Sequence, residues 1–458
     1  MKRCFYLLIF AAMALRGQVP TDSVIRAILA DRIDTLHQGV GIVVGIVDAH
    51  GRRFVSYGSF SVKDPRPVGN DTVFEIGSTT KVFTSTILAD MVQRGEVSLD
   101  DPVAKYLPAD VKMPRRGGKQ ITLIDLATHT SGLPRMPSNF APKNIENPYA
   151  DYTVANLFQF LSTYELKRDI GSQFEYSNMG VGLLGQALAR RAGMDYEALV
   201  RARVTGPLKM ENTRIALSPE MKSRLAPGHN EARQPTANWD LPTFAGAGAL
   251  RSDARDMLTF IAAHLGFVES PLGPAMAAMT KVRRPAGNPQ TEVALAWIVA
   301  KKDGREIYWH NGGTGGYRSF IGFDPKSRVG VVLLSNMSTR TGMDDIGMHL
   351  LDASAPLAKL SPLVTHKEIA LDPKIFDRYV GVYQFAPGVA LTFTREGAHM
   401  FTQLTNQPKF EIFAEGGKDF FVKAVDRQFT FETGADGRAT AATLHQNGRD
   451  QKAKRVEP

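Results

Sequence analysis

Cysteine is almost absent from this sequence of 458 residues, and the only one is Cys4. Cys4 begins an apolar run that ends at Leu15 and follows the basic residues Lys2 and Arg3. A basic start, about a dozen apolar residues and nearby small residues are typical of a secretory signal peptide. We therefore expect residues 1–17 to be a signal peptide and the mature protein to be periplasmic or secreted. The mature chain would contain no cysteine, which excludes disulfides, a thiol nucleophile and a zinc–thiolate site.

Long apolar runs and long basic runs are absent as well. No segment after residue 17 offers the roughly 18 consecutive apolar residues of a membrane span, so we expect none once the signal is removed. Lys and Arg outnumber Asp and Glu by 55 to 46, but the densest basic spots are pairs such as Arg115-Arg116. This scatter argues against a nucleic-acid partner. The 43% hydrophobic and 22% charged composition is ordinary for a globular protein and excludes disorder and collagen-like repeats.

Strand and helix patterns occur at both ends of the first 350 residues. Runs at 41–47 and 53–57, separated by a turn, predict a hairpin. Residues 79–94 have helical spacing, with an apolar face of Phe83, Ile87, Leu88, Met91 and Val92. Further strands are predicted at 295–300, 305–309, 318–323 and 329–335. The pattern predicts an α/β domain in which an antiparallel sheet uses both ends of the segment, flanked by helices, with an all-helical region between them.

The composition changes near residue 355. Residues 353–371 are typical of a linker because prolines cluster there. Beyond it, 10 of the 25 phenylalanines fall within the last 87 residues, and seven short alternating runs are spaced by turn-like stretches. We therefore expect a main domain over 18–352, a linker over 353–371 and a small antiparallel β-barrel over 372–458.

Ser78 and Lys81 are spaced for a chemical interaction. Ser78-Thr-Thr-Lys81 opens the predicted helix, so the amine can reach the hydroxyl. The helix start also places backbone N–H groups and the positive end of the dipole beside a developing oxyanion. At ordinary serine usage about one Ser-x-x-Lys is expected by chance. A Ser78 that only caps the helix is therefore an equal alternative.

Two further segments carry residues that could perform chemistry. Tyr176-Ser-Asn178 is the only Tyr-x-Asn in the chain, and a lysine charge beside Tyr176 would favour the phenolate and make it a general base. The glycines of His310-Asn-Gly-Gly-Thr-Gly-Gly316 would let a substrate lie against a strand edge. A half-buried tyrosine with a turn asparagine, and a flexible hairpin with a structural histidine, are the respective alternatives.

Two other candidates are weaker. Lys302-Asp-Gly304 is typical of a turn between strands rather than of a substrate-binding element. His129, within the loop 128–134, is expected to fix that loop by hydrogen bonding rather than to act as a base.

In this order, Ser78-x-x-Lys81, Tyr176-x-Asn178 and His310-x-Gly312 resemble the motifs of the serine β-lactamase and penicillin-binding protein superfamily. More narrowly, they resemble its class C β-lactamase-like branch, peptidase family S12. The resemblance covers about residues 25–350 and includes the blocks 121–134, 207–210 and 309–317. The tail from about residue 372 is similar to the lipocalin-like C-terminal domains of some members.

The resemblance implies catalytic roles for three residues. Ser78 would attack a carbonyl and form an acyl-enzyme, Lys81 would take or relay its proton, and Tyr176 would be the partner acid and base. The backbone N–H groups of Ser78 and Gly313 would form the oxyanion hole. This chemistry requires no metal and no cofactor.

It also implies substrate-binding roles. Asn178 would bind the acylamide side chain of the substrate, and the third motif, His310, Asn311 and Gly312, would line the site. Most β-lactamases of this branch carry Lys-Thr-Gly there, where Lys and Thr help to hold the substrate carboxylate. His310 is mostly neutral near pH 7 and attracts an anion less, and it is similar to the histidine of certain DD-peptidases and D-aminopeptidases.

We therefore expect a D-Ala-D-Ala carboxypeptidase or endopeptidase that acts on peptidoglycan peptides and is acylated by penicillin. A class C-like β-lactamase is the nearest alternative, followed by a carboxylesterase or D-aminopeptidase. A non-catalytic sensor or wall-binding protein is the least expected, because binding alone has no need of Ser78, Lys81 and Tyr176 together.

Overall fold

The computed structural model describes residues 19–363, 366–405, 407, 409–423, 427–446 and 449–456. The expected signal peptide, residues 1–17 with Cys4, lies outside the described residues. The chain divides into two compact units, Met1–His229 with Pro235–Lys359 and Asn230–Gln234 with Leu360–Pro458. Each unit is described by itself.

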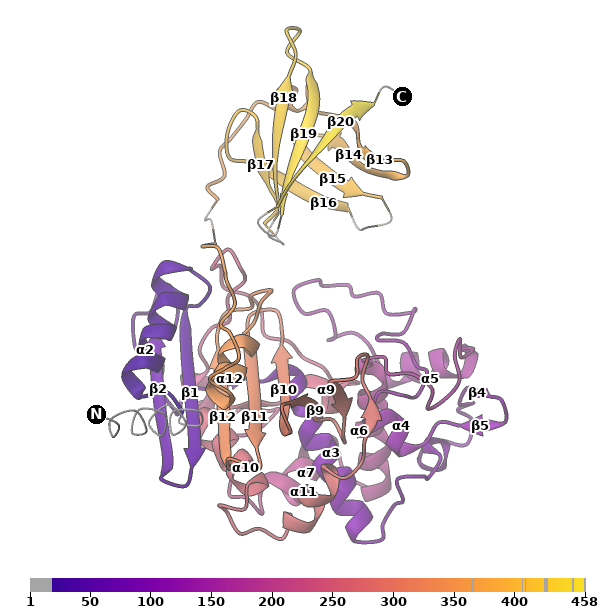
Figure 1. Cartoon of the computed structure of the whole chain (residues 1–458). Coiled ribbons are helices and arrows are strands. Elements are labelled where there is room, and N and C mark those ends of the chain that lie inside the picture. Colours follow the sequence, from indigo (N-terminus) through magenta and orange to yellow (C-terminus); the bar gives the residue numbers. More distant parts are fainter. Residues whose placement is uncertain are drawn as a thin grey trace, which may run out of the picture. The chain divides into compact units, whose positions relative to one another are not determined.

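An eight-stranded antiparallel sheet organises the first unit, in the order β2-β1-β12-β11-β10-β9-β8-β7 (Figure 1). Ile42 pairs with Ser335, so the sheet joins both ends of the unit as the sequence predicts. The strand predicted at 295–300 begins instead at Ile298, because Ala296 has a φ of +63° and interrupts the extended backbone. The strands are β1 (Gly41–Asp48), β2 (Gly51–Gly58), β7 (Arg284–Pro285), β8 (Thr291–Val293), β9 (Ile298–Lys302), β10 (Arg305–Gly313), β11 (Arg318–Asp324) and β12 (Val329–Ser335).

Helices cover both faces of this sheet (Figure 1). On one face, α2 (Asp22–Ala30) and α12 (Asp344–Leu351) pack against the strands and share an apolar core with them. On the other face, α10 (Ala254–His264) packs against β1 and β12. Successive β1 residues alternate between the two cores, as a strand buried on both faces requires.

The remaining elements of this unit are further helices, short helical turns and two short strand pairs. The helices are α3 (Thr80–Gln93), α4 (Leu123–Ala127), α5 (Val154–Thr163), α6 (Asn178–Ala192), α7 (Tyr196–Val200), α8 (Pro219–Arg224), α9 (Ala245–Gly248) and α11 (Gly273–Met279). Two short 3-10 helices are η2 (Gly77–Thr79) and η3 (Val103–Tyr106), and two short π-helices are η1 (Asp31–Thr35) and η4 (Arg201–Thr205). Short strand pairs are β3 (Phe74–Glu75) with β6 (Arg251–Ser252) and β4 (Arg115–Arg116) with β5 (Lys119–Gln120).

The helix predicted over 79–94 is α3, but the single apolar face expected for it is wrong. Every residue from Thr80 to Met91 is buried, because α3 packs against α6, α9 and α11 at once. Its polar side chains find partners inside the protein: the hydroxyl of Thr86 donates to the carbonyl of Val82, 2.8 Å away. A helix that lies in the centre of a domain needs no solvent face.

The second unit is a closed barrel of eight antiparallel strands, ordered β13 to β20. Its interior is filled by aromatic side chains, among them Tyr383, Phe393 and Phe429. The sequence predicts seven strands; the eighth, β20, was missed because Arg449–Val456 has no alternating apolar pattern. The elements are α13 (Pro373–Phe376), β13 (Gly381–Ala386), β14 (Val389–Glu396), β15 (His399–Leu404), β16 (Lys409–Ala414), β17 (Asp419–Phe421), β18 (Gln428–Thr433), β19 (Ala439–Gln446) and β20 (Arg449–Val456).

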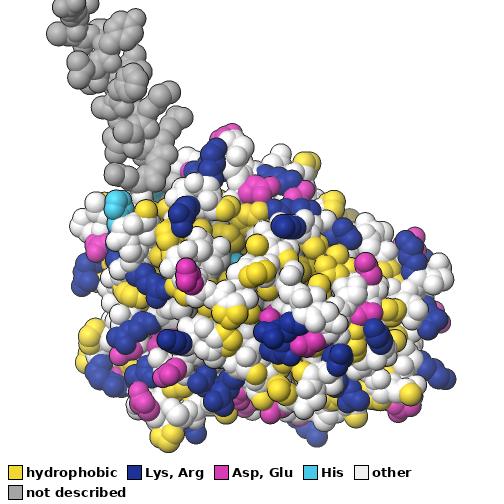
Figure 2. Space-filling view, turned by 90° about the horizontal axis from the view of Figure 1, so that it is seen from below, with side chains coloured by type: hydrophobic (Ala, Val, Ile, Leu, Met, Phe, Trp, Pro, Cys, Tyr) yellow, Lys and Arg dark blue, Asp and Glu magenta, His cyan; other side chains and the backbone are white. Residues whose placement is uncertain are grey.

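In the described part of the chain, no helix has both the length and the apolar composition needed to cross a membrane. On the face shown in Figure 2, acidic and basic side chains are interspersed rather than gathered into a field of one sign. This distribution agrees with the scattered charge of the sequence.

Candidate active site

Ser78 lies in the turn η2, between the short strand β3 and the central helix α3. It is partly exposed, whereas its neighbours Gly77 and Thr79 are buried. Gly77 has a φ of +49°, and a Cβ there would lie 2.7 Å from the backbone nitrogen of Gly313. Glycine is therefore required at position 77, both for the left-handed conformation and for the close approach of β10.

The glycine-rich segment presses against this turn instead of forming a flexible loop. His310 to Gly313 belong to β10, and a Cβ on Gly312 would lie 2.0 Å from the carbonyl oxygen of Ile76. On β11, Ser319 donates to that same carbonyl at 2.8 Å. These contacts fix the end of β10 beside Ser78.

Lys81 is a titratable hydrogen-bond partner of the serine. Its Nζ lies 2.9 Å from the Ser78 Oγ and 2.7 Å from the carbonyl oxygen of Ala247, to which it donates. The lysine side chain is completely buried, and this desolvation, together with the charge of Arg135, holds the pKa of Lys81 well below its usual value. The amine can therefore be neutral and accept a proton.

The structure excludes the alternative in which Ser78 only caps the helix. The N-cap of α3 is Thr79, and no side chain caps the helix there. The Ser78 hydroxyl instead interacts with the Lys81 amine and with the hydroxyl of Tyr176.

Tyr176 is half-buried over Lys81, with the amine 4.9 Å from the ring centroid. Burial raises the pKa of Tyr176 to about 12, although its hydrogen bond to Ser78 opposes the rise. The sequence argument for a phenolate is therefore wrong on physical grounds. It relied on the lysine charge, whereas burial lowers the pKa of Lys81 and so disfavours that charge, and burial of the phenol itself raises the pKa of Tyr176.

His129 supports Tyr176 from beneath, with the two rings stacked 4.5 Å apart. Its Nδ1 accepts the backbone N–H of Ser177 at 3.1 Å, which confirms the prediction of a loop-fixing histidine. Burial, and then the neighbouring Lys81, keep the pKa of His129 far below its usual value. The imidazole is therefore neutral.

Asn178 is the first residue of α6 and lies on the same side of the site as Tyr149. A side-chain hydrogen bond joins it to the Tyr149 hydroxyl. Its Oδ1 is buried and has no protein partner. The asparagine therefore offers an acceptor that is not satisfied within the protein.

His310 is fully buried on the face of β10 that is turned toward Tyr176, with the two ring centroids 6.3 Å apart. Its Nδ1 lies 2.6 Å from the carbonyl oxygen of Asn311, so this nitrogen must carry the proton. Burial lowers the pKa of His310 to about 3, and Lys81 contributes to the decrease. The imidazole is neutral, and its buried Nε2 has no protein partner.

The structure does not bring the Asn311 side chain together with Ser78. Alternation along β10 turns Asn311 to the opposite face from His310. There its Nδ2 donates to Asp344 on α12 at 2.5 Å. Burial raises the pKa of Asp344 to about 6, and the hydrogen bond from Asn311 opposes this increase.

Three residues of the site were not identified from the sequence. Glu75 lies on β3, three residues before Ser78, is buried and accepts the backbone N–H of Trp239 at 3.0 Å. The carbonyl of Ala247 holds the Lys81 amine, and a backbone group leaves no sequence signal. Arg135 directly follows the block 121–134, so its position next to that block was the available signal.

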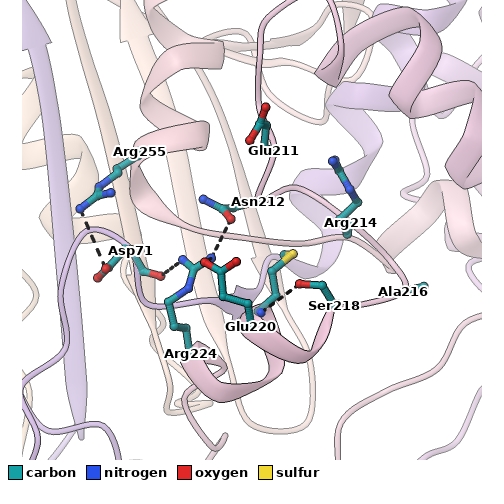
Figure 3. A pocket seen from close by; sticks show the side chains of 10 residues that line it. Asp71, Glu211, Asn212, Arg214, Ala216, Ser218, Glu220, Arg224 and Arg255 are labelled. Atoms are coloured by element: carbon teal, nitrogen blue, oxygen red, sulfur yellow. Dashed lines mark hydrogen bonds and ion pairs between the residues drawn. The ribbon is translucent and has the colours of Figure 1, made fainter.

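A cavity of about 520 Å³ lies elsewhere in the first unit and contains none of the predicted site residues (Figure 3). Some of its polar side chains contact one another. Arg224 donates to the carbonyl oxygen of Asp71 at 2.7 Å and to Asn212 at 2.8 Å. Arg255 lies 4.0 Å from the Asp71 carboxylate.

Comparisons with known proteins cover both units. Residues 25–355 match the family model described as Beta-lactamase, and residues 365–455 match the model described as Domain of unknown function (DUF3471). D-alanyl-D-alanine-carboxypeptidase/endopeptidase AmpH of Escherichia coli strain K12 is 32% identical over 356 residues, which cover 73% of this chain and 89% of the relative. Penicillin-binding protein 4* of Bacillus subtilis strain 168 is 24% identical over 457 residues, covering 94% and 98%.

Solved structures of β-lactamases and a related carboxypeptidase are also similar to this chain. A class C β-lactamase from Rhodobacter sphaeroides is similar with a TM-score of 0.62 and 27% identity, over 71% of this chain and 98% of that one. A β-lactamase/D-alanine carboxypeptidase from Yersinia pestis, complexed with citrate, gives 0.62 and 25%, over 72% and 98%.

Proposed function

Because this chain belongs to the beta-lactamase family of serine hydrolases, we propose that it is a D-Ala-D-Ala carboxypeptidase or endopeptidase of peptidoglycan peptides. It acts outside the cytoplasm, after loss of residues 1–17, through an acyl-enzyme on Ser78. The same serine is acylated by penicillins.

In acylation, the neutral Lys81 amine accepts the Ser78 proton as Oγ attacks the scissile carbonyl. The backbone N–H groups of Ser78 and Gly313 stabilise the oxyanion. Tyr176, which keeps its proton because its pKa is raised to about 12, gives that proton to the leaving nitrogen as the C–N bond breaks. Lys81 then returns a proton to Tyr176, so the net transfer runs from Ser78 to the leaving group.

In deacylation, water attacks the ester carbonyl and loses a proton to the same basic group that served in acylation. Neutral Lys81 takes the proton, the bond from carbon to the Ser78 oxygen breaks, and Lys81 returns the proton to Ser78. Asn178 binds the acylamide of the substrate, and His310 and Gly312 line the strand edge on which the peptide lies. All of these groups come from the chain itself.

The environment of His310 is the observation that favours peptidase activity over β-lactamase activity. It is buried, and its pKa is lowered to about 3, so no cation stands where most β-lactamases of this branch hold the drug carboxylate with a lysine. The relative AmpH, named as a carboxypeptidase/endopeptidase, supports the same choice. Relatives named Beta-lactamase, such as that of Escherichia coli strain K12 at 25% identity, keep β-lactam turnover as the second candidate.

The test is to incubate the protein with a peptide ending in D-Ala-D-Ala and, separately, with benzylpenicillin, and to follow free D-Ala and drug loss. We expect release of D-Ala and slow, near-stoichiometric drug consumption, both lost in Ser78→Ala. Fast drug turnover without release of D-Ala would replace the proposal by the β-lactamase. Hydrolysis of short esters alone would replace it by a carboxylesterase.

A further inference from the structure

Arg135 is anchored to the segment that carries Tyr176 and Asn178. Its carbonyl oxygen accepts the backbone N–H groups of Asn178 at 3.1 Å and Met179 at 3.2 Å. The preceding carbonyl, of Pro134, accepts the Ser177 hydroxyl at 2.6 Å. The base of the arginine side chain is therefore fixed next to the catalytic tyrosine.

The guanidinium of Arg135 lies at the mouth of the site. The residue is exposed, and its Cζ lies 5.1 Å from the centroid of the Tyr176 ring. Within the described residues, no carboxylate lies within ion-pair distance of it, and its charged group contacts the face of the Tyr176 ring. It is a cation beside the nucleophile without a protein counter-charge.

The electrostatic neighbours of Arg135 show which side of Ser78 it occupies. Its charge lowers the pKa of Lys81, and it opposes the rise that burial causes in the pKa of Tyr149. Tyr149 is the partner of Asn178 and lies against Trp239, with ring centroids 5.3 Å apart. Arg135 therefore shares its side of the site with Asn178, which in the proposed mechanism binds the acyl half of the substrate.

We propose that Arg135 is a specificity residue that binds a carboxylate in the acyl half of the substrate, the part that stays on Ser78 when the bond is cut. The inference rests on the proposed role of Asn178. A planar guanidinium pairs with a carboxylate through two parallel hydrogen bonds. The preferred substrates are then peptides with an acidic group upstream of the scissile D-Ala.

Carbenicillin and benzylpenicillin provide a matched pair of probes, because they differ by one carboxylate in the acyl side chain and share the carboxylate of the nucleus. The measurement is the second-order rate of acylation by each drug, from intact mass against time, for wild type, Arg135→Gln and Arg135→Lys. The control is Arg190→Gln, which removes an exposed arginine near the end of α6. Any general effect of Arg135 on Lys81 cancels in the ratio of the two rates.

We expect Arg135→Gln to lower the carbenicillin-to-benzylpenicillin ratio about tenfold, the usual size for loss of a hydrogen bond to a charged group. Arg135→Lys should lose less, and Arg190→Gln should leave the ratio unchanged. An unchanged ratio in Arg135→Gln would overturn the proposal, whether the two rates stay as in wild type or decrease equally.

If neither drug acylates the wild-type protein, it is the proposed function that has failed. The role of Arg135 is then decided with two esters, p-nitrophenyl hydrogen adipate and p-nitrophenyl hexanoate, which differ in a terminal carboxylate. A selective loss of adipate hydrolysis in Arg135→Gln supports the role, and equal hydrolysis ratios in variant and wild type refute it.

Discussion

The proton affinities of a few buried side chains decide what this site can do. A lysine in water is charged near pH 7 and cannot accept a proton, but Lys81 is completely buried and has the positive Arg135 nearby. Both effects disfavour the ammonium form. The same burial keeps Tyr176 protonated, so the base and the acid of the mechanism are assigned by environment rather than by residue type.

This assignment predicts a shift in pH dependence. In the proposed mechanism acylation requires neutral Lys81, so we expect kcat/KM to decline as the pH falls through the pKa of its amine. Removing the like charge in Arg135→Gln raises that pKa, and we expect the acidic limb of the profile to move to higher pH, by a small amount because the arginine is exposed. The measurement is kcat/KM against pH for one neutral ester.

Arg190→Gln is the control for the loss of one surface charge and should reproduce the wild-type limb. A limb that moves to lower pH in Arg135→Gln, or does not move, would contradict the assignment of Lys81 as the base.

The three motifs could be found from residue types and spacing, because a serine and a lysine three positions apart on a helix must share a face. The directions of the pKa shifts could not, since they depend on burial by segments far away in the sequence. Asn311 shows the same limit, because its hydrogen bond goes to Asp344, which no local pattern connects to it.

Among the elements, the contact between β10 and the segment that leads into η2 leaves no room for an added side-chain atom. Gly312 lies so close to the carbonyl of Ile76 that a Cβ would be 2.0 Å from its oxygen and 2.4 Å from the Ser319 Oγ. A methyl group at this position must push the strand away from Ser78. The proposed substrate edge and the proposed oxyanion hole would then be misaligned together.

We therefore expect Gly312→Ala to lower kcat/KM at least about a hundredfold and to reduce the free energy of unfolding by about 1–3 kcal/mol, as overpacking usually does. The readouts are ester hydrolysis and urea unfolding. Gly273→Ala is the matched control, because a Cβ at Gly273 meets nothing within 4 Å. Wild-type activity in Gly312→Ala would show that β10 does not form the substrate edge.

Elements with strong local patterns were predictable, and elements that depend on their surroundings were not. The hairpin of β1 and β2 and the turn at Asp303, whose φ is +51°, follow from turn chemistry. β20 pairs with both β13 and β19 although its sequence is highly charged, because closing the barrel supplies partners for its backbone. α3 is buried on all sides for a similar reason, since its neighbours come from distant segments.

At the scale of the whole molecule, two units are built on separate cores that share no residue. The first core surrounds α3, where Phe83 stacks on Phe260 with ring centroids 4.4 Å apart. The second fills the barrel around Phe393. A core that belongs to one unit stabilises that unit alone.

Two substitutions test this independence. Phe83→Ala and Phe393→Ala should each cost about 3–5 kcal/mol by leaving a cavity, and each should shift a different transition in differential scanning calorimetry of the full chain. Activity should be lost at a lower temperature only in Phe83→Ala. A single transition that both substitutions shift equally would show that the two units unfold as one.

The most direct test of the central assignment, a Ser78 nucleophile served by Lys81 and Tyr176, is intact mass spectrometry of the protein with excess benzylpenicillin over time. The account predicts one adduct of the full drug mass that deacylates slowly, maps to the peptide containing Ser78 and is absent in Ser78→Ala. An adduct that persists in Ser78→Ala, or that maps to another residue, would contradict it.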